Sequence, residues 1–85
     1  MLVFTKHFHE MLKQRNIAEA WVKRTIDDPD KIESHDGGIT RHYLKKIIEI
    51  DDRWLRVVVN ANDLPNKAIT VFFDRRLRRK HENYP

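Results

Sequence analysis

The hydrophobic pattern of the chain changes from a helical to a strand-like period about a third of the way along. Before that point, apolar residues recur every three or four positions, as at Phe4, Phe8 and Met11. Residues at this spacing lie on one face of a helix, so the pattern is typical of amphipathic helices. It predicts one helix over residues 6–15 and a second over residues 18–27.

Residues that suit helix termini stand at the ends of both predicted helices. The Thr5 hydroxyl can accept a hydrogen bond from an amide of the first turn, as N-cap residues do. Asn16 tolerates the left-handed conformation in which many helices end, and the residue before Pro29 avoids helical dihedral angles. We therefore expect two separate helices that form a helical hairpin with one apolar side.

The rest of the chain has the alternating period of strands. Residues 53–75 alternate strongly, which predicts two antiparallel strands joined by a polar turn over residues 60–67. Before them, the turn signal at Gly37 separates a short predicted strand over residues 31–34 from a longer one over residues 41–50. Consecutive strands with short turns favour an antiparallel meander.

The two faces of the predicted sheet differ in character. One is wholly apolar in the hairpin and is expected to consist of Leu55, Val57, Val59, Ile69, Val71 and Phe73. The other is mixed and is expected to carry Tyr43, Lys45, Trp54, Arg56, Val58, Asn60, Thr70 and Phe72. These faces predict a two-layer α+β fold, in which the N-terminal helical hairpin packs on one face of a three- to four-stranded antiparallel sheet. The mixed face is too apolar for plain solvent surface, so a partner, a second copy in a homodimer or the C-terminal segment is expected to cover it.

Size and composition indicate one small domain. We expect residues 1–80 to form it and residues 81–85 to be a flexible tail. The chain has no cysteine, which fits a reducing compartment. No apolar run approaches the roughly 20 residues of a membrane span, and the N-terminus lacks the pattern of a signal peptide. The sequence therefore predicts a cytoplasmic protein that does not contact the membrane.

Positive charge is concentrated towards the C-terminus. The first forty residues carry a net charge of −1 and the remainder carries +5. Much of the excess comes from the basic cluster over residues 75–80. Such clusters attract polyanions, of which nucleic acid is the common one. The competing interpretation is a solvated tail that only aids solubility.

Common catalytic signatures are missing, so the candidate chemistry rests on single residues. The five histidines lack a convincing ligand spacing, and the sequence predicts no metal site and no cofactor. The remaining residue types suit metal-free RNA cleavage, in which a 2′-hydroxyl attacks the adjacent phosphate. This reaction needs proton-transfer groups, such as His7 or Tyr43, and cations for the phosphate, such as Lys45, Arg56 and Arg75. The competing interpretation is that these are ordinary surface and packing residues.

Several motifs, taken in order, resemble a bacterial protein family. The first helix carries the run HFHEMLKQRNI over residues 7–17, which is similar to the family pattern H-A-x-x-R-M-x-x-R-G-I. Met11 replaces the arginine of that pattern and Asn16 replaces its glycine. The other matching motifs are Asp28-Pro29-Asp30, Arg41-x-Tyr43, residues 55–58 and residues 69–75. Over nearly its full length the chain thus resembles the family catalogued as domain of unknown function 4258.

The resemblance implies a fold and a function. The family is related to the RelE and BrnT toxins of toxin–antitoxin modules, which have a barnase-like fold and bind RNA on the sheet face away from the helices. It implies a metal-independent endoribonuclease that acts on RNA, free or ribosome-bound, and is blocked by an antitoxin protein. By position, His7, Arg15, Arg56 and Thr70 match family motifs.

Together, the residue chemistry and the resemblance give one set of expectations. The alternative is a binding module of the same fold, without chemistry, for nucleic acid or protein. The predicted catalytic residues are His7, Tyr43, Lys45 and Arg56. The predicted RNA-binding residues are Arg15, Arg41, Thr70, Arg75, Arg76, Arg78, Arg79 and Lys80.

Overall fold

Helices come first in the chain and the long strands follow, as the hydrophobic pattern predicts. The computed structural model describes residues 2–77; the predicted tail over 81–85 and the predicted RNA contacts Arg78, Arg79 and Lys80 lie outside this range. The helices are α1 (Lys6–Gln14) and α2 (Glu19–Asp27). The strands are β1 (Leu2–Val3), β2 (Lys31–His35), β3 (Thr40–Ile47), β4 (Arg53–Asn60) and β5 (Asn66–Phe73).

Both predicted helices are confirmed, with ends set by the expected residues. The amide of Phe8 donates to the Thr5 hydroxyl at 3.2 Å, so Thr5 is the N-cap of α1. Asn16 has a φ of 56°, the left-handed conformation expected after the helix. The second helix ends at Asp27, and its C-cap Asp28 stands directly before Pro29. Local sequence therefore explains where α1 begins and where both helices end.

The described strands form one sheet of five, in the order β1-β5-β4-β3-β2. Strands β2 to β5 form the predicted antiparallel meander, closed by short turns at Asp36–Gly38 and Ile48–Ile50 and by the loop before β5. Strand β1, a two-residue strand that pairs in parallel with the start of β5, is absent from the predicted elements. A strand of two residues is too short to show an alternating pattern, which explains why the sequence does not indicate it.

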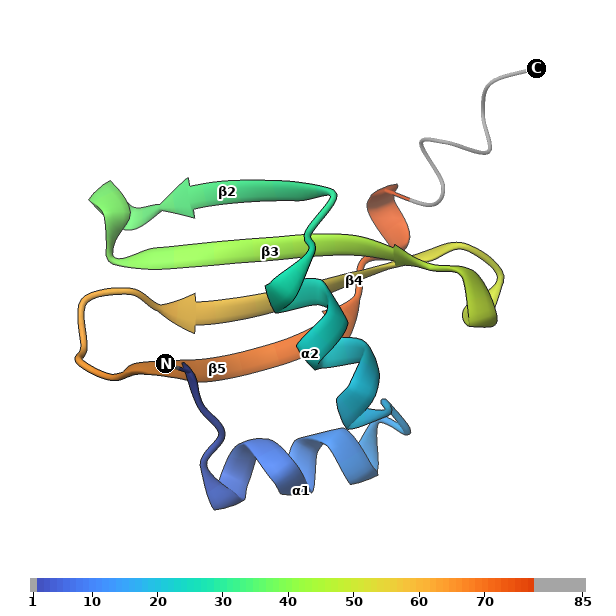
Figure 1. The fold of residues 1–85 in the computed structure, drawn as a ribbon, viewed down its shortest axis with the longest axis horizontal. Coiled ribbons are helices and arrows are strands. Elements are labelled where there is room, and N and C mark those ends of the chain that lie inside the picture. Colours follow the sequence, from blue (N-terminus) through green and yellow to red (C-terminus); the bar gives the residue numbers. More distant parts are fainter. Residues whose placement is uncertain (1, 78–85) are drawn as a thin grey trace.

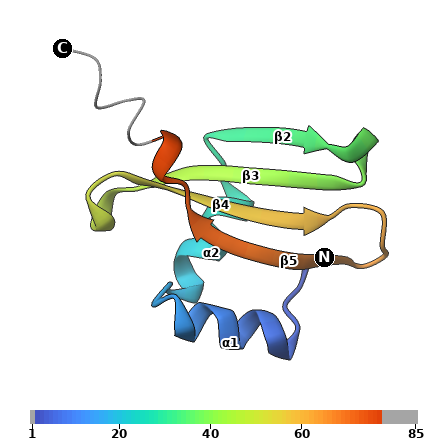
Figure 2. The ribbon, with the colours of Figure 1, turned by 180° about the vertical axis from the view of Figure 1, so that it is seen from behind.

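The helices cover one side of the sheet, but they do so unequally. In Figure 1, α2 crosses in front of the sheet, while α1 lies beside β5. Figure 2 shows the opposite side, where neither α1 nor α2 lies over the strands. We call this side the open face. Each helix has more contacts with the sheet than with the other helix, so the pair differs from the tightly packed hairpin that we expected.

The main core lies between the helices and the sheet. It is formed by apolar side chains from both helices and from the inner positions of β3, β4 and β5. Its fully buried members include Phe8, Val22, Ile47, Leu55, Val57 and Val71. The predicted helix-covered positions of β4 are thus confirmed.

The predicted face assignment of β3 is wrong. Tyr43 lies opposite Val57 in the register and Lys45 lies opposite Leu55, so both share the helix-covered side. Physically, Lys45 is drawn there by the end of α2: its Nζ donates to the Asp28 carbonyl at 2.7 Å. A cation at a helix C-terminus satisfies an unpaired carbonyl and the helix dipole.

One predicted core residue of β5 is also misplaced. Val59 pairs with Ala68, whereas Val58 pairs with Thr70, so Ile69 is the extra residue of a β-bulge. Ile69 is accordingly exposed and Ala68 is buried. A strict period of two cannot survive an inserted residue, which explains the error.

Among residues 2–77, no helix is long and apolar enough to span a lipid bilayer.

Candidate functional site on the open sheet face

Polar side chains from three neighbouring strands meet on the open face. Glu33 of β2 lies opposite His42 of β3, and Leu44, two residues on from His42, lies opposite Arg56 of β4. Because residues two apart on a strand share a face, His35 joins the same group. The turn at Asp36–Gly38 fixes this register by reversing the chain directly after β2. We call Glu33, His35, His42 and Arg56 the open-face cluster.

Hydrogen bonds indicate which ring nitrogen donates and which accepts in each histidine of this cluster. A guanidinium can only donate, so His42 Nδ1, 2.8 Å from Arg56 Nη1, carries no proton. His35 Nε2 lies 3.0 Å from Glu33 Oε1, and an ionised carboxylate can only accept, so Nε2 carries the proton. The two imidazole rings stack with centroids 4.0 Å apart. Two differently oriented imidazoles therefore stand side by side.

Arg56 is the buried centre of an ion-pair network. Its Nε and Nη2 donate to Asp74 Oδ2 at 2.9 and 2.8 Å, and its Nη1 donates to Glu33 Oε1 at 3.0 Å. Asp74 also accepts from Arg76, whose side chain is 82% exposed. Arg56 is thus held on all sides, while Arg76 remains accessible to an anion at the surface.

A shallow hollow of about 400 Å³ lies over the cluster. Its wall includes Phe72 on β5 and the segment just after this strand. The lining residues are Glu33, His35, His42, Arg56, Phe72, Asp74, Arg76 and Leu77. Proton-transfer groups, cations and an aromatic ring therefore surround one surface depression.

The environment lowers the pKa of three groups in this hollow. Hydrogen bonds from His35 and then from Arg56 hold the pKa of Glu33 at about 2. Burial, followed by the charges of His35 and Arg56, lowers the pKa of His42 below 6.5. Burial alone would raise the pKa of Asp74, but hydrogen bonds from Arg76 and Arg56 outweigh it and lower the pKa. At neutral pH both carboxylates are ionised and His42 is neutral.

These shifts predict acid-sensitive stability. All three pKa values are lower in the folded than in the unfolded chain, so the unfolded chain binds more protons in acid. The free energy of unfolding should therefore be highest above pH 6.5 and should fall below it as unfolded His42 becomes protonated. It should fall further below pH 4.5 as the unfolded carboxylate of Glu33 is protonated. Urea denaturation at a series of pH values across this range, with a chelator present, would measure the free energy of unfolding.

The variant His42→Asn separates the loss of stability caused by His42 from the loss caused by Glu33. His42→Asn keeps an acceptor near Arg56 but does not titrate, so the loss that begins below pH 6.5 should be reduced. The loss below pH 4.5 should remain, because Glu33 is unchanged. A wild-type stability that is constant from neutral pH down to pH 4.5 would contradict the role given to His42.

The structure does not bring the four predicted catalytic residues together. Arg56 lies in the open-face cluster, whereas Tyr43 and Lys45 lie on the helix-covered side. His7 is an exposed residue of α1, which lies beside β5, far along the sheet order from β2. The expectation that Tyr43 and Lys45 share the open face with Arg56 is therefore wrong, because it relied on the mistaken face assignment of β3.

The predicted RNA-binding residues are dispersed in the same way. Arg15 donates to the Val71 carbonyl at 2.6 Å and to Thr70 Oγ1 at 3.2 Å, and so ties α1 to the edge of β5. Arg41 donates to the Tyr43 hydroxyl at 3.3 Å on the helix-covered side. Arg75 is exposed just after β5, next to Arg76 at the open-face hollow. Contact between these residues and RNA stays a prediction.

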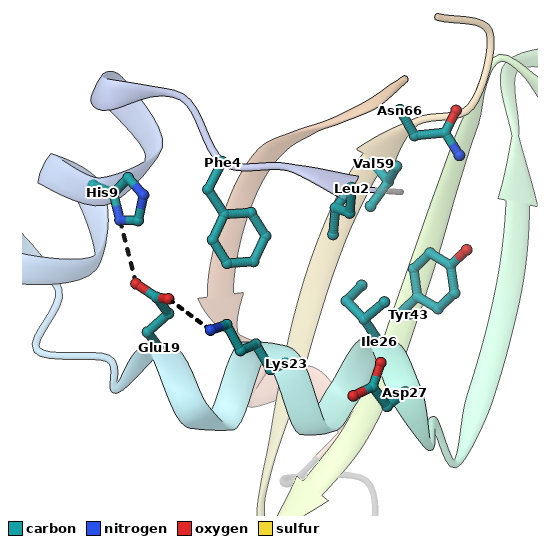
Figure 3. Close-up of a pocket in the computed structure, with 10 residues that line it drawn as sticks. All are labelled: Leu2, Phe4, His9, Glu19, Lys23, Ile26, Asp27, Tyr43, Val59 and Asn66. Carbon is teal, nitrogen blue, oxygen red and sulfur yellow. Dashed lines mark ion pairs between the residues drawn. The ribbon is translucent and has the colours of Figure 1, made fainter. Parts of the chain in front are cut away.

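A second hollow, of about 610 Å³, lies on the helix-covered side (Figure 3). Glu19 at its rim pairs with His9 at 3.4 Å and with Lys23 at 3.2 Å. Its walls are mixed, with Phe4 and Ile26 beside the polar Asp27 and Asn66, and Tyr43 lies at its far end in Figure 3. Among the described residues, its lining has one imidazole and no arginine, so it is less suited to phosphate chemistry than the open-face hollow, which has two imidazoles and two arginines.

The open face exposes less apolar surface than the sequence predicts. Leu44 and Val58 lie on it, yet they are 0% and 8% exposed. The Lys46 ammonium lies 5.8 Å from the centre of the Trp54 ring and partly covers it. A homodimer through this face stays a prediction, with a smaller apolar area to support it.

The comparisons with known proteins gave a match to one family model. The model described as Domain of unknown function (DUF4258) matches residues 4–73, which include all of α1, α2 and the long strands. The comparison with curated proteins found no match, and neither did the comparison with solved structures. Because the family model covers most of the chain, the protein belongs to the DUF4258 family.

Proposed function

We propose that the protein is a metal-independent endoribonuclease, related to the RelE and BrnT toxins, that cleaves RNA at the open sheet face. The observation that carries the proposal is the open-face cluster, which together with Arg76 combines two imidazoles, a carboxylate and two arginines around one hollow. RNA cleavage by an internal 2′-hydroxyl needs groups of this kind. The proposed site keeps Arg56 from the sequence prediction and replaces the other three residues.

His35 is the proposed general base. Glu33 fixes the tautomer with the proton on Nε2, which leaves Nδ1 able to take the proton of the 2′-hydroxyl. The 2′-oxygen then attacks phosphorus, the bond to the 5′-oxygen breaks, and water supplies the proton to that leaving oxygen. The products are a 2′,3′-cyclic phosphate and a 5′-hydroxyl end.

Arg76 and His42 are the proposed phosphate ligands. The exposed guanidinium of Arg76 can hold two phosphate oxygens, the bidentate contact that arginine makes best. His42 carries its proton on Nε2, since Nδ1 accepts from Arg56, and can donate it to a phosphate oxygen. Arg56 is held by Asp74 and Glu33 and acts as a positioning residue.

The test compares wild-type protein with His35→Ala. His9→Ala is the matched control, because His9 also pairs with a glutamate, Glu19, but on the helix-covered side. Induced expression in bacteria, with growth and protein synthesis followed, would also detect activity that needs the ribosome. Wild type and His9→Ala should arrest synthesis, whereas His35→Ala should not.

A biochemical assay measures the size of the effect. Loss of a general base lowers the rate by about 10²–10⁴-fold, so His35→Ala should cleave RNA, free or on ribosomes, more slowly by that factor. Cleavage should continue in a chelator and leave 2′,3′-cyclic ends. Folded wild-type protein that neither cleaves RNA nor arrests synthesis would refute the proposal.

The second candidate is a binding module without chemistry, and the saturation of Arg56 favours it. Every guanidinium nitrogen of Arg56 already has a protein partner in the open-face cluster or in Asp74. Such a module would bind nucleic acid, or an antitoxin-like protein, without cleaving it. Nucleic-acid binding that falls steeply with salt and leaves the RNA intact would identify this function.

A further inference from the structure

Three metal-ligating side chains of the open-face cluster converge. Glu33, His35 and His42 each offer one ligand atom, and these atoms lie within 4.8 Å of one another. The hairpin of β2 and β3 brings them together, because Glu33 lies opposite His42 and His35 is two residues from Glu33. The three ligands therefore come from neighbouring positions on the paired strands β2 and β3.

The ligand set suits a zinc-like ion. Zn²⁺ prefers imidazole nitrogen and carboxylate oxygen at about 2.0–2.2 Å, usually with four ligands in a tetrahedron. Ligand atoms in such a tetrahedron lie about 3.3 Å apart by this geometry, and His35 Nε2 is already 3.0 Å from Glu33 Oε1. Small side-chain rotations would bring all three atoms within range, and a solvent molecule could complete the shell.

Arg56 shows that the position between the ligands favours positive charge. Its Nη1 lies 3.0 Å from Glu33 Oε1 and 2.8 Å from His42 Nδ1, so this nitrogen stands between two of the three proposed ligands. Asp74 holds the other two nitrogens of Arg56 independently, at 2.9 and 2.8 Å. The Nη1 contact can therefore be given up while the guanidinium stays paired with Asp74.

We propose that Glu33, His35 and His42 bind one divalent transition-metal ion of the zinc class, which displaces Arg56 Nη1 and shuts the open-face site. The binding of the ion is independent of the proposed ribonuclease function, but the inhibition rests on it. An ion on His35 and Glu33 occupies the proposed base and its carboxylate partner. RNA cleavage is then blocked until the ion is removed.

Calorimetric titration of untagged, chelator-treated protein with zinc chloride tests the binding. Wild type should bind one Zn²⁺ at this site, and Mg²⁺ should not replace it, because Mg²⁺ prefers oxygen ligands. His35→Ala and His42→Ala should each weaken binding by at least about tenfold, since loss of even an outer-shell partner costs about 10–100-fold. His7→Ala and His9→Ala are the controls and should bind as wild type does.

Imidazole NMR signals of the wild-type protein give a second measurement that needs no variant. Zn²⁺ should shift the signals of His35 and His42 before those of His7 and His9. No binding, or shifts confined to His7 and His9, would overturn the proposal. If Zn²⁺ binds at the cluster but wild type never cleaves RNA, the metal site is supported and the ribonuclease function is refuted. If wild type cleaves RNA but does not bind Zn²⁺, the ribonuclease function is supported and the metal site is refuted.

Discussion

Replacing Arg56 with alanine is expected to lower the free energy of unfolding by about 3–5 kcal/mol, the cost of breaking a buried ion pair by removing one partner. Arg56 is 6% exposed and Asp74 is 3% exposed, so the variant would leave the Asp74 carboxylate buried without this guanidinium. Glu33 and His42 would lose a hydrogen bond in the same step. Because a chain of this size has a stability of about 4–13 kcal/mol, the variant should unfold at much lower urea concentrations.

Arg24→Ala is the matched control. Arg24 makes an equally short two-nitrogen contact with Glu49, at 2.8 Å for both bonds, but this pair is exposed. Exposed pairs contribute little, because water already solvates both charges. The loss for Arg24→Ala should therefore be much smaller. Equal losses for the two variants would show that burial of the Arg56 network does not stabilise the fold.

This burial changes how Arg56 can be used as a probe of function. The sequence places Arg56 among the catalytic residues, for which an alanine variant would be the usual test. In the folded protein the same variant disturbs Asp74, Glu33 and His42 together, so lost activity would not distinguish chemistry from unfolding. His35 is a better probe, because its side chain is 45% exposed and its polar contact is with Glu33 at the edge of the network.

The helices, the long hairpin and the meander could be predicted because local signals coincide there. Thr5 and Pro29 mark helix ends by their own chemistry, and the β4 positions Leu55, Val57 and Val59 keep a strict period of two. In each case the signal lies within a few residues of the feature. No tertiary contact is needed to interpret it.

The face assignment of β3 and the register of β5 depend on tertiary contacts. Tyr43 and Leu44 are about equally suited to a core, so the pattern of β3 alone does not choose a side. The end of α2 chooses it, because Lys45 pairs with the Asp28 carbonyl. The bulge at Ile69 likewise cannot be seen in a pattern that assumes one residue per step.

The open-face cluster was missed although the sequence contains part of its signal. Glu33 and His35, two apart on a strand, must share a face, and the turn after His35 returns the chain beside them. Pairing across that turn would have placed His42 opposite Glu33. Strand β2 was predicted to end at Ser34, so His35 was left in the turn and the group was not recognised.

The final large effect concerns the other side of the sheet, where Phe8 anchors α1. Phe8→Ala is expected to cost about 3–5 kcal/mol, the usual range for removing a large buried aromatic side chain. Phe8 is 0% exposed and its ring lies 4.9 Å from that of Phe4, so the variant leaves a cavity between α1 and the sheet. The helix is only nine residues long, too short to be stable without this packing.

Urea denaturation and amide exchange together test this role of Phe8. Exchange should quicken most in α1 and at the edge of β5, where Arg15 bonds the Val71 carbonyl. Ile48→Ala is the control, because Ile48 is 78% exposed and exposed substitutions usually change stability by less than about 0.5 kcal/mol. A Phe8→Ala variant as stable as the control, with unchanged exchange, would mean that α1 is not held by its core contacts. If exchange quickens only in α1 and at the edge of β5, the open-face cluster is supported by the meander itself and not by α1.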